Sequence, residues 1–269
     1  MSIITISRGT FSGGRDLADC LGAKLGYPCL SREVIAEAAA QYGVSQAALG
    51  AALGRAPSLR DRVSRDRDKY LAYIRAVLCQ HAVGGRLIYH GNAGHHLLAG
   101  IRHVIRVRVI ADIRYRVDAA MRQLNLSSRQ AETHIRKVDE ERRKWTRFLY
   151  GVEWDDPSNY DVVLNLEFLG VAGACELVTR VTELEMFRKT DESQAAMEDL
   201  ALASLVTAAL ARDSRTTHGE FRVGAQRGAI TVDGIVRQQE IADAVTVVAS
   251  AVDGVKTLTS HVVTAGLFT

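Results

Sequence analysis

The sequence predicts an α/β protein, with a parallel sheet that carries helices on both faces and a smaller αββαβ unit after it. Short β-branched runs alternate with longer segments whose apolar residues recur every three or four positions. The first run ends in a glycine-rich turn, and after Ser193 the pattern changes to a separate set of short elements. We therefore predict two domains, 1–192 and 193–269.

Composition limits the class of protein. The chain has 269 residues, of which 47% are hydrophobic and 24% charged, so it can bury a substantial core. The net charge is +3, and the positive excess lies before Ser193. This distribution suits an anionic ligand such as nucleotide phosphates, and it is too weak to predict a nucleic-acid partner.

The start of the chain lacks the features of an export signal. "MSIITISRG" has no basic segment, no long apolar stretch and no cleavage site. No run of about 18 apolar residues predicts a transmembrane segment. The four cysteines have no metal-like spacing and are most simply reduced thiols. We expect a cytoplasmic protein.

The first elements form a strand, a loop and a helix. Ile3–Ser7 is a short apolar run that predicts a buried strand, and a helical pattern starts at Gly14. The apolar residues of this helix are Leu17, Leu21 and Leu25. Gly26 and Pro28 end it. A glycine loop between a strand and a helix is the context that a phosphate-binding loop requires.

The elements up to 187 continue the alternation. The pattern predicts mainly helix over 34–83, strands over 86–91, 103–111 and 160–166, and helices over 113–124, 127–151 and 171–187. Such alternation favours a parallel sheet, because parallel neighbours need crossover connections. After Ser193 we expect a helix over 195–213, two strands within 221–236, a helix over 238–255 and a strand over 256–263. This last unit carries no catalytic constellation.

The stretch Gly9–Asp16 has the frame of a P-loop, G-x-x-x-x-G-K-[ST], with Arg15 in place of lysine and Asp16 in place of the hydroxyl residue. Glycines let several backbone N–H groups face one anion at the positive end of a helix. Arg15 can fork onto two phosphate oxygens, and Asp16 can hold Mg²⁺ directly or through water. The alternative is a structural turn in which Asp16 only favours the helix N-terminus.

The stretch "IITISRGTFSGGRDLADCLGAKLGYPCLSREVI" resembles the start of the cytidylate kinase-like branch of the P-loop nucleoside monophosphate kinases. In that branch an Arg-Asp or Arg-Glu ending of the loop is normal. "LIYHGNAGHHLL", "VRVIADIRYRV" and "IRKVDEERRKWTRFLYGVEWDDPSNYDVVLN" resemble later parts of it. The resemblance covers about 1–188. It implies a P-loop kinase fold with about five parallel strands, an acceptor-binding helical insertion and a mobile lid, with ATP as co-substrate and Mg²⁺.

The resemblance also implies which residues bind the substrates. The donor phosphates would contact Ser12, Gly13, Gly14, Arg15, Asp16 and Arg116. The acceptor would contact Arg32 and Asn92. Catalytic roles would fall to Arg15, Asp16, Asp139 and Arg142. For Arg32 the alternative is a surface arginine at the start of a helix, and for Arg116 it is a solvated helix face.

The lid carries the richest charge. Its candidate residues are Arg136, Lys137, Asp139, Arg142 and Arg143. A spacing of three puts Arg136, Asp139 and Arg142 on one helical face, where the carboxylate can hold the arginines in place. In the resembling kinases such arginines close over the transferring phosphoryl group. The alternative is an exposed helix with many salt bridges.

Two features depart from the family pattern. Many relatives have G-R-G or G-R-D after the central strand, where this chain has Gly91-Asn92-Ala93, and Asn92 can hydrogen-bond a base or sugar but has no charge. No acidic residue ends that strand as a Walker B Asp would. A metal site at His90, His95 and His96 is disfavoured, because His95 and His96 are adjacent and would point apart on a helix.

The segment from about 196 to 264 resembles a BON domain. The stretches that carry this are "VTAALARD", "RVGAQRGAITVDGIV", "IADAVTVVASAVDGVKTL" and "SHVV", with Gly228, Gly234 and Gly254 at the turns. Such modules have been linked to phospholipid or partner binding. This unit is slightly acidic, which disfavours anionic lipid. We expect it to mediate regulation, homo-oligomerisation or contact with a protein partner.

Two functions remain open at this point. The first is an ATP-dependent kinase of a nucleoside monophosphate, with CMP or dCMP as the leading acceptor. The second is a nucleotide-binding sensor that has lost turnover and signals through the BON-like domain. Turnover that depends on the acceptor distinguishes them.

Overall fold

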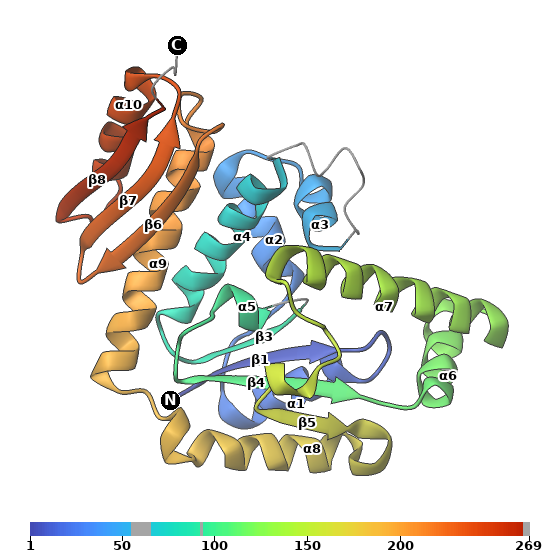
Figure 1. Ribbon diagram of the computed structural model, residues 1–269. Coiled ribbons are helices and arrows are strands. Elements are labelled where there is room, and N and C mark those ends of the chain that lie inside the picture. Colours follow the sequence, from blue (N-terminus) through green and yellow to red (C-terminus); the bar gives the residue numbers. More distant parts are fainter. Residues whose placement is uncertain (55–65, 92–93, 266–269) are drawn as a thin grey trace. The chain divides into compact units, whose positions relative to one another are not determined.

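The computed structural model describes residues 1–54, 66–91 and 94–265, which fall into two compact units (Figure 1). The first unit contains Met1–Glu33 and Gly84–Thr190. The second contains Val34–Ala52, 66–83 and 191–265. The helices of 34–83 are thus grouped with the C-terminal part of the chain. The division into 1–192 and 193–269 stays a proposal.

The first unit is built on a five-stranded sheet with the order β2-β3-β1-β4-β5, in which every neighbouring pair is parallel. The strands are β1 (Ile3–Arg8), β2 (Cys29–Leu30), β3 (Leu87–His90), β4 (Val104–Ile110) and β5 (Val162–Asn165). The predicted parallel sheet is confirmed. β2 has only two residues, too few to show a period, so the sequence pattern missed it.

The helices of the first unit are α1 (Gly14–Leu25), α5 (Gly94–Leu97), α6 (Ile113–Leu124), α7 (Ser128–Tyr150) and α8 (Leu166–Glu183), with short 3₁₀ turns at Pro157–Asn159 and Glu185–Phe187. Helices α1, α5 and α8 pack against the sheet, and α6 and α7 pack against each other. α1 and α8 share one core cluster with β1, β3 and β4, in which Leu17, Leu21 and Val178 are fully buried. The periodic leucines of the first helix therefore face the core: Leu17 and Leu21 are fully buried in it, and the partly buried Leu25 packs against it.

The boundaries of α7 and α8 follow from local side chains. Ser127 and Gln130 form a capping box that starts α7. Asn165 accepts a hydrogen bond from the Glu167 N–H and starts α8, earlier than the predicted start at 171. Gly170 interrupts α8 with φ 63° and ψ 169°, a conformation open to glycine. The sequence pattern thus found only the part of α8 beyond this interruption.

The second unit contains the αββαβ element order that the sequence predicts. Its helices and strands are α2 (Arg32–Tyr42, from Val34 on), α3 (Gln46–Gly54), α4 (Asp66–Ala82), α9 (Asp191–Arg212), β6 (Glu220–Gln226), β7 (Ala229–Val236), α10 (Gln239–Ser250) and β8 (Thr257–Thr264). The sheet has the order β6-β7-β8, with β6–β7 antiparallel and β7–β8 parallel. Its core joins Val206 of α9, Val232 of β7 and Val245 of α10.

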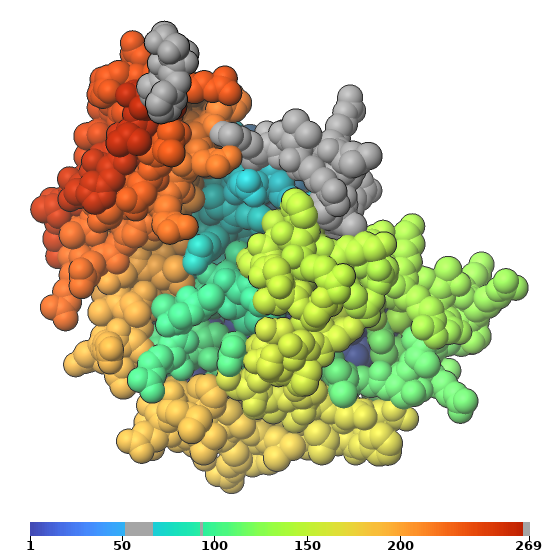
Figure 2. Space-filling view, viewed as in Figure 1, coloured from blue at the N-terminus to red at the C-terminus, as the bar shows by residue number. Residues whose placement is uncertain are grey.

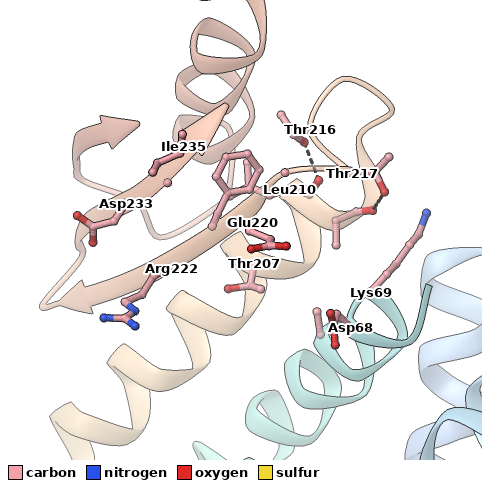
Figure 3. A pocket seen from close by; sticks show the side chains of 15 residues that line it. Asp68, Lys69, Thr207, Leu210, Thr216, Thr217, Glu220, Arg222, Asp233 and Ile235 are labelled. Atoms are coloured by element: carbon pink, nitrogen blue, oxygen red, sulfur yellow. Dashed lines mark hydrogen bonds between the residues drawn. The ribbon is translucent and has the colours of Figure 1, made fainter. Parts of the chain in front are cut away.

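Helix α4 belongs to the second unit because it packs along α9. Ser204 of α9 lies 3.7 Å from the Cys79 sulfur of α4, and the Gln194 amide donates to the Val83 carbonyl at 3.1 Å. A pocket of about 640 Å³ lies where α4, α9 and the edge of the small sheet meet (Figure 3). Charged residues from three elements line it, namely Asp68, Lys69, Glu220, Arg222 and Asp233.

One helical stretch, Glu185–Arg212, is long and apolar enough to cross a membrane by length and composition, with a mean hydropathy of 1.2. Its Met197, Val206 and Leu210 are buried, and Val206 and Leu210 belong to the core cluster of the second unit. Of the 18-residue window that gives this hydropathy, 33% is buried inside the protein.

Candidate functional site

The loop after β1 curls back on itself at the start of α1. The Ser12 hydroxyl is buried and donates to the Gly9 carbonyl at 2.9 Å, and the Ser12 N–H donates to the same oxygen at 3.2 Å. Gly13 caps α1 with φ 85°, which favours glycine. The first N–H groups of α1 have no partner within the helix, so the loop can bind an anion there. Ser12 holds this turn with its side chain.

Two loop glycines make room for arginine side chains. A Cβ atom on Gly14 would lie 2.5 Å from Cδ of Arg8, and one on Gly9 would lie 3.1 Å from Cζ of Arg116. Arg8 therefore crosses the loop at the start of α1, and Arg116 of α6 covers its other end. A larger residue at Gly14 would displace the Arg8 side chain.

The lid helix α7 contacts the loop through Asp139. This carboxylate accepts from the Thr10 N–H at 3.0 Å and the Thr10 hydroxyl at 2.7 Å, and it is ion-paired with Arg116. Arg116 also donates from Nε to the Thr10 carbonyl at 2.8 Å. Figure 2 shows that α7 and the segment after it cover most of the N-terminal segment from this side. Asp139 thus fixes the lid to the loop.

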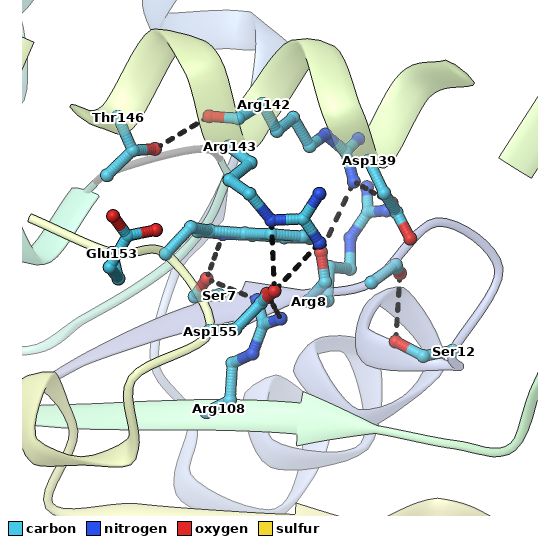
Figure 4. Close-up of polar contacts among 12 residues, drawn as sticks. Ser7, Arg8, Ser12, Arg108, Asp139, Arg142, Arg143, Thr146, Glu153 and Asp155 are labelled. Atoms are coloured by element: carbon cyan, nitrogen blue, oxygen red, sulfur yellow. Dashed lines mark hydrogen bonds and ion pairs between the residues drawn. The ribbon is translucent and has the colours of Figure 1, made fainter. Parts of the chain in front are cut away.

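Arg142 extends from α7 to the same loop. Its Nη1 donates to the Arg8 carbonyl at 3.2 Å and the Thr10 hydroxyl at 3.1 Å, and lies 3.8 Å from the Asp139 carboxylate (Figure 4). Burial, and then the nearby charge of Arg8, lower the pKa of Arg142 to about 10. A cation that is disfavoured in this way is poised to accept an anion.

A second arginine cluster anchors the end of the lid. Arg108 of β4 is buried, stacks 3.8 Å from the Trp154 ring centroid, and donates to Ser7 and Asp155, each at 3.2 Å. Arg143 of α7 pairs with the same Asp155 at 2.8 Å. The pairing of Ser7 with Arg108 in the sheet puts this cluster beside the loop. The segment after α7 is therefore fixed to the sheet.

The predicted site residues separate into two groups. Six of them meet at the loop, as described above, namely Ser12, Gly13, Gly14, Arg116, Asp139 and Arg142. Arg15 is exposed and lies 3.7 Å from Asp19 on its own helix, and Asp16 is also exposed. Arg136 pairs with Glu132 on α7, and Lys137 is exposed. The expected Arg136–Asp139–Arg142 face is thus replaced by an Arg116–Asp139–Arg142 contact.

The two residues predicted to contact the acceptor are Arg32 and Asn92. Arg32 is exposed at the start of α2, and Asn92 lies outside the described residues. Arg8, Arg108 and Thr10 were not predicted as site residues. The sequence could have indicated Arg108, because an arginine within the apolar run "VIRVRVI" needs a buried partner or a functional role. Arg8 also offered a clue, because it directly follows the predicted buried strand Ile3–Ser7.

The histidines near β3 lie close together. The rings of His95 and His96 are 3.9 Å apart between centroids, so the expectation that they point apart is wrong. α5 has only four residues, and so short a helix does not separate them. Among the described residues no group of three or more His, Cys, Asp or Glu side chains could hold a metal ion.

Acid should destabilise the protein through His95. Burial, and then His96, lower the pKa of His95 to about 3, below that of an exposed histidine. His95 therefore binds a proton in the unfolded chain at a pH where it stays neutral in the folded protein. The free energy of unfolding falls as the pH drops below about 6.5. At about pH 5 the loss should be about 2 kcal/mol for this group.

Urea unfolding at about pH 7 and pH 5 measures this effect. His95→Gln should lose about 2 kcal/mol less than the wild type between the two values. His218→Gln, at an exposed histidine of the second unit, should lose as much as the wild type. An unchanged acid dependence in His95→Gln would contradict the prediction.

Comparison with known proteins identifies a family and structures of similar fold. The sequence model of the Cytidylate kinase-like family matches residues 3–167. A search of curated proteins gave no match. A structure of an uncharacterized protein from Eubacterium ventriosum is similar, with TM-score 0.53 and 18% identity over 68% of this chain and 99% of that one. A shikimate kinase from Bacteroides thetaiotaomicron is similar at TM-score 0.43 and 11% identity, covering 68% and 99%.

Proposed function

Because the chain belongs to the cytidylate kinase-like family, we propose that it transfers a phosphoryl group from ATP to a nucleoside monophosphate, with CMP or dCMP as the leading acceptor. The family relation supports nucleotide-dependent phosphoryl transfer. The observation that carries the proposal is the convergence of Arg8, Arg116 and Arg142 on one glycine loop, from three different elements.

Phosphoryl transfer needs positioning and positive charge more than covalent chemistry from the protein. The N–H groups at the start of α1 would hold the donor phosphates, and Arg142 would neutralise charge on the transferring group. Arg116 holds the loop through Thr10 and acts as a positioning residue. Since Asp139 fixes Thr10 and pairs with Arg116, we assign Asp139 to positioning as well.

The residues present fit Mg²⁺ bound together with the nucleotide. Asp16 is exposed in the first turn of α1, next to the loop. Mg²⁺ commonly binds one or two carboxylates, phosphate oxygens and water, so one accessible carboxylate is enough. The ion would supply charge neutralisation between the donor phosphates.

The acceptor side remains a proposal. Burial, and then the charge of Arg32, lower the pKa of Arg8. This positive charge near the loop supports Arg32 as a contact for the acceptor phosphate. Asn92 would contact the base or the sugar.

The second candidate is a nucleotide sensor with weak or no turnover. The contact between Asp139 and Thr10 favours it, because the lid is held on the loop by the protein's own carboxylate. In this case the second unit, which we propose to be BON-like, would bind a partner, a lipid or another copy of the chain. Its pocket beside β6 is a candidate place for such a contact.

A coupled assay of ADP release from Mg-ATP tests the proposal. We expect release that depends on the acceptor, strongest with CMP or dCMP among a panel of nucleoside monophosphates. Reactions without acceptor measure the background. No release with any acceptor, together with ATP binding in calorimetry, would reject the kinase and leave the sensor.

A further inference from the structure

The geometry points to Arg8, and not Arg15, as the side chain that replaces the missing P-loop lysine and contacts the donor phosphates. This inference rests on the proposed function for the identity of the ligand. Arg15 occupies the lysine position in the sequence, whereas Arg8 is the residue directly before the loop. The two side chains are placed very differently by the structure.

Arg15 faces away from the loop. Its side chain is 77% exposed, and Nε lies 3.7 Å from Asp19 one turn later on α1. An exposed arginine that is paired on its own helix has water and a carboxylate as partners already. It would have to leave both to reach an anion in the loop.

Arg8 lies across the end of the loop, at Gly14. Its Cβ, Cγ and Cδ are 2.8, 3.1 and 2.5 Å from the position of a Cβ on Gly14, so its stem runs directly over the backbone of that glycine. This is where the loop becomes the first turn of α1. The stem therefore passes beside the N–H groups that would bind a phosphate, so the guanidinium can reach a phosphate held there.

The surroundings of Arg8 leave its charge poorly compensated. Burial, then Arg32 and then Arg15 lower the pKa of Arg8, and Asp16 and Asp139 only partly oppose this. Its Nε is buried and has no hydrogen-bond partner among the described residues. A partly buried cation beside other cations is disfavoured in the unliganded protein, and a bound anion would offset this cost.

A phosphate chain is the anion that fits this arrangement. A guanidinium can bind two oxygens at once, and the Arg8 carbonyl already accepts a hydrogen bond from Arg142 of the lid. Arg8 would therefore contact the donor phosphates from the sheet side while Arg142 contacts them from the lid side.

Calorimetry with Mg-ATP and with inorganic tripolyphosphate tests the inference on the full chain. Arg8→Met keeps the stem over Gly14 and should weaken both ligands about 10-fold to 100-fold. Arg8→Lys keeps the charge but loses the fork, and should recover part of the affinity. Arg15→Met should weaken them less than about threefold. Arg122→Met, at an exposed residue of α6, is the control.

A structural role for Arg8 would give a different result. If Arg8 only supported the fold, Arg8→Met would lower the melting temperature, whereas removal of a poorly compensated cation should leave it unchanged or raise it. Loss of binding in Arg15→Met with little change in Arg8→Met and Arg8→Lys would overturn the inference. Should Arg8→Met fail to fold, full affinity in Arg15→Met together with loss in Arg8→Lys would support it.

The same measurements separate this inference from the proposed function. Tripolyphosphate binding that depends on Arg8, in a protein without ADP release, would uphold Arg8 and reject the kinase. ADP release that is unaffected in the Arg8 variants would uphold the kinase and reject Arg8. A wild-type protein that binds neither ligand would reject both.

Discussion

Replacing Arg142 by methionine should lower the turnover number about 100-fold to 1,000-fold, the usual cost of removing one group that stabilises charge in the transition state. Arg142 bridges the lid and the loop by its bonds to the Arg8 carbonyl and the Thr10 hydroxyl. Methionine keeps much of the side-chain volume and removes the charge. The loss should therefore appear in kcat more than in KM for ATP.

Steady-state kinetics and thermal melting of the Arg142→Met protein measure this expectation. Arg129→Met is the control, since Arg129 is an exposed arginine on the same helix, and it should keep wild-type kinetics. Equal rates in the Arg142→Met protein and the wild type would mean that the lid arginines form only a solvated, salt-bridged face.

Replacing Asp139 by asparagine should destabilise the first unit by about 2–4 kcal/mol, because it breaks a largely buried ion pair from one side. The side chains of Asp139 and Arg116 are only 13% and 14% exposed. Without the carboxylate, Arg116 and Arg142 lose the anion between them, and only the neutral amide oxygen of asparagine is left to accept from Thr10. The lid should then be held less firmly on the loop.

An added anion should compensate for part of this loss. Inorganic tripolyphosphate should raise the melting temperature of Asp139→Asn more than that of the wild type, because it replaces the missing negative charge. Glu132→Gln is the matched control, as Glu132 pairs with Arg136 in an exposed part of α7. A stability equal to that of the wild type would show that Asp139 does not connect the lid to the loop.

Two tryptophans make the lid observable. The chain has 2 tryptophans, Trp145 in α7 and Trp154 in the segment after it, and both are buried. Tryptophan fluorescence, excited selectively over the 8 tyrosines, therefore reports on this region alone. It allows movement of the lid to be followed in each of the variants above, with and without nucleotide.

The sequence predicted the helices correctly where a periodic pattern extended over many consecutive residues. The leucines of α1 and the capping box of α7 are visible in the sequence, and both helices formed where expected. The failures have local causes as well. β2 is too short to show a period, and Gly170 hides the first turn of α8. The short α5 brings together the two histidines that were expected to point apart.

The sequence by itself determined the glycine loop between β1 and α1, the order of the longer strands and helices, and the arginine-rich helix α7. These depend on residues that are neighbours along the chain, so spacing alone reveals them. Only the tertiary structure decided which arginines serve the loop. A helical period shows which residues share a face, but not which other element packs against that face. Asp139 therefore pairs with Arg116 of α6, whereas Arg136 of its own helix pairs with Glu132. In the same way Arg8 crosses Gly14 while Arg15 points to solvent, because side-chain direction depends on the packing of the whole unit.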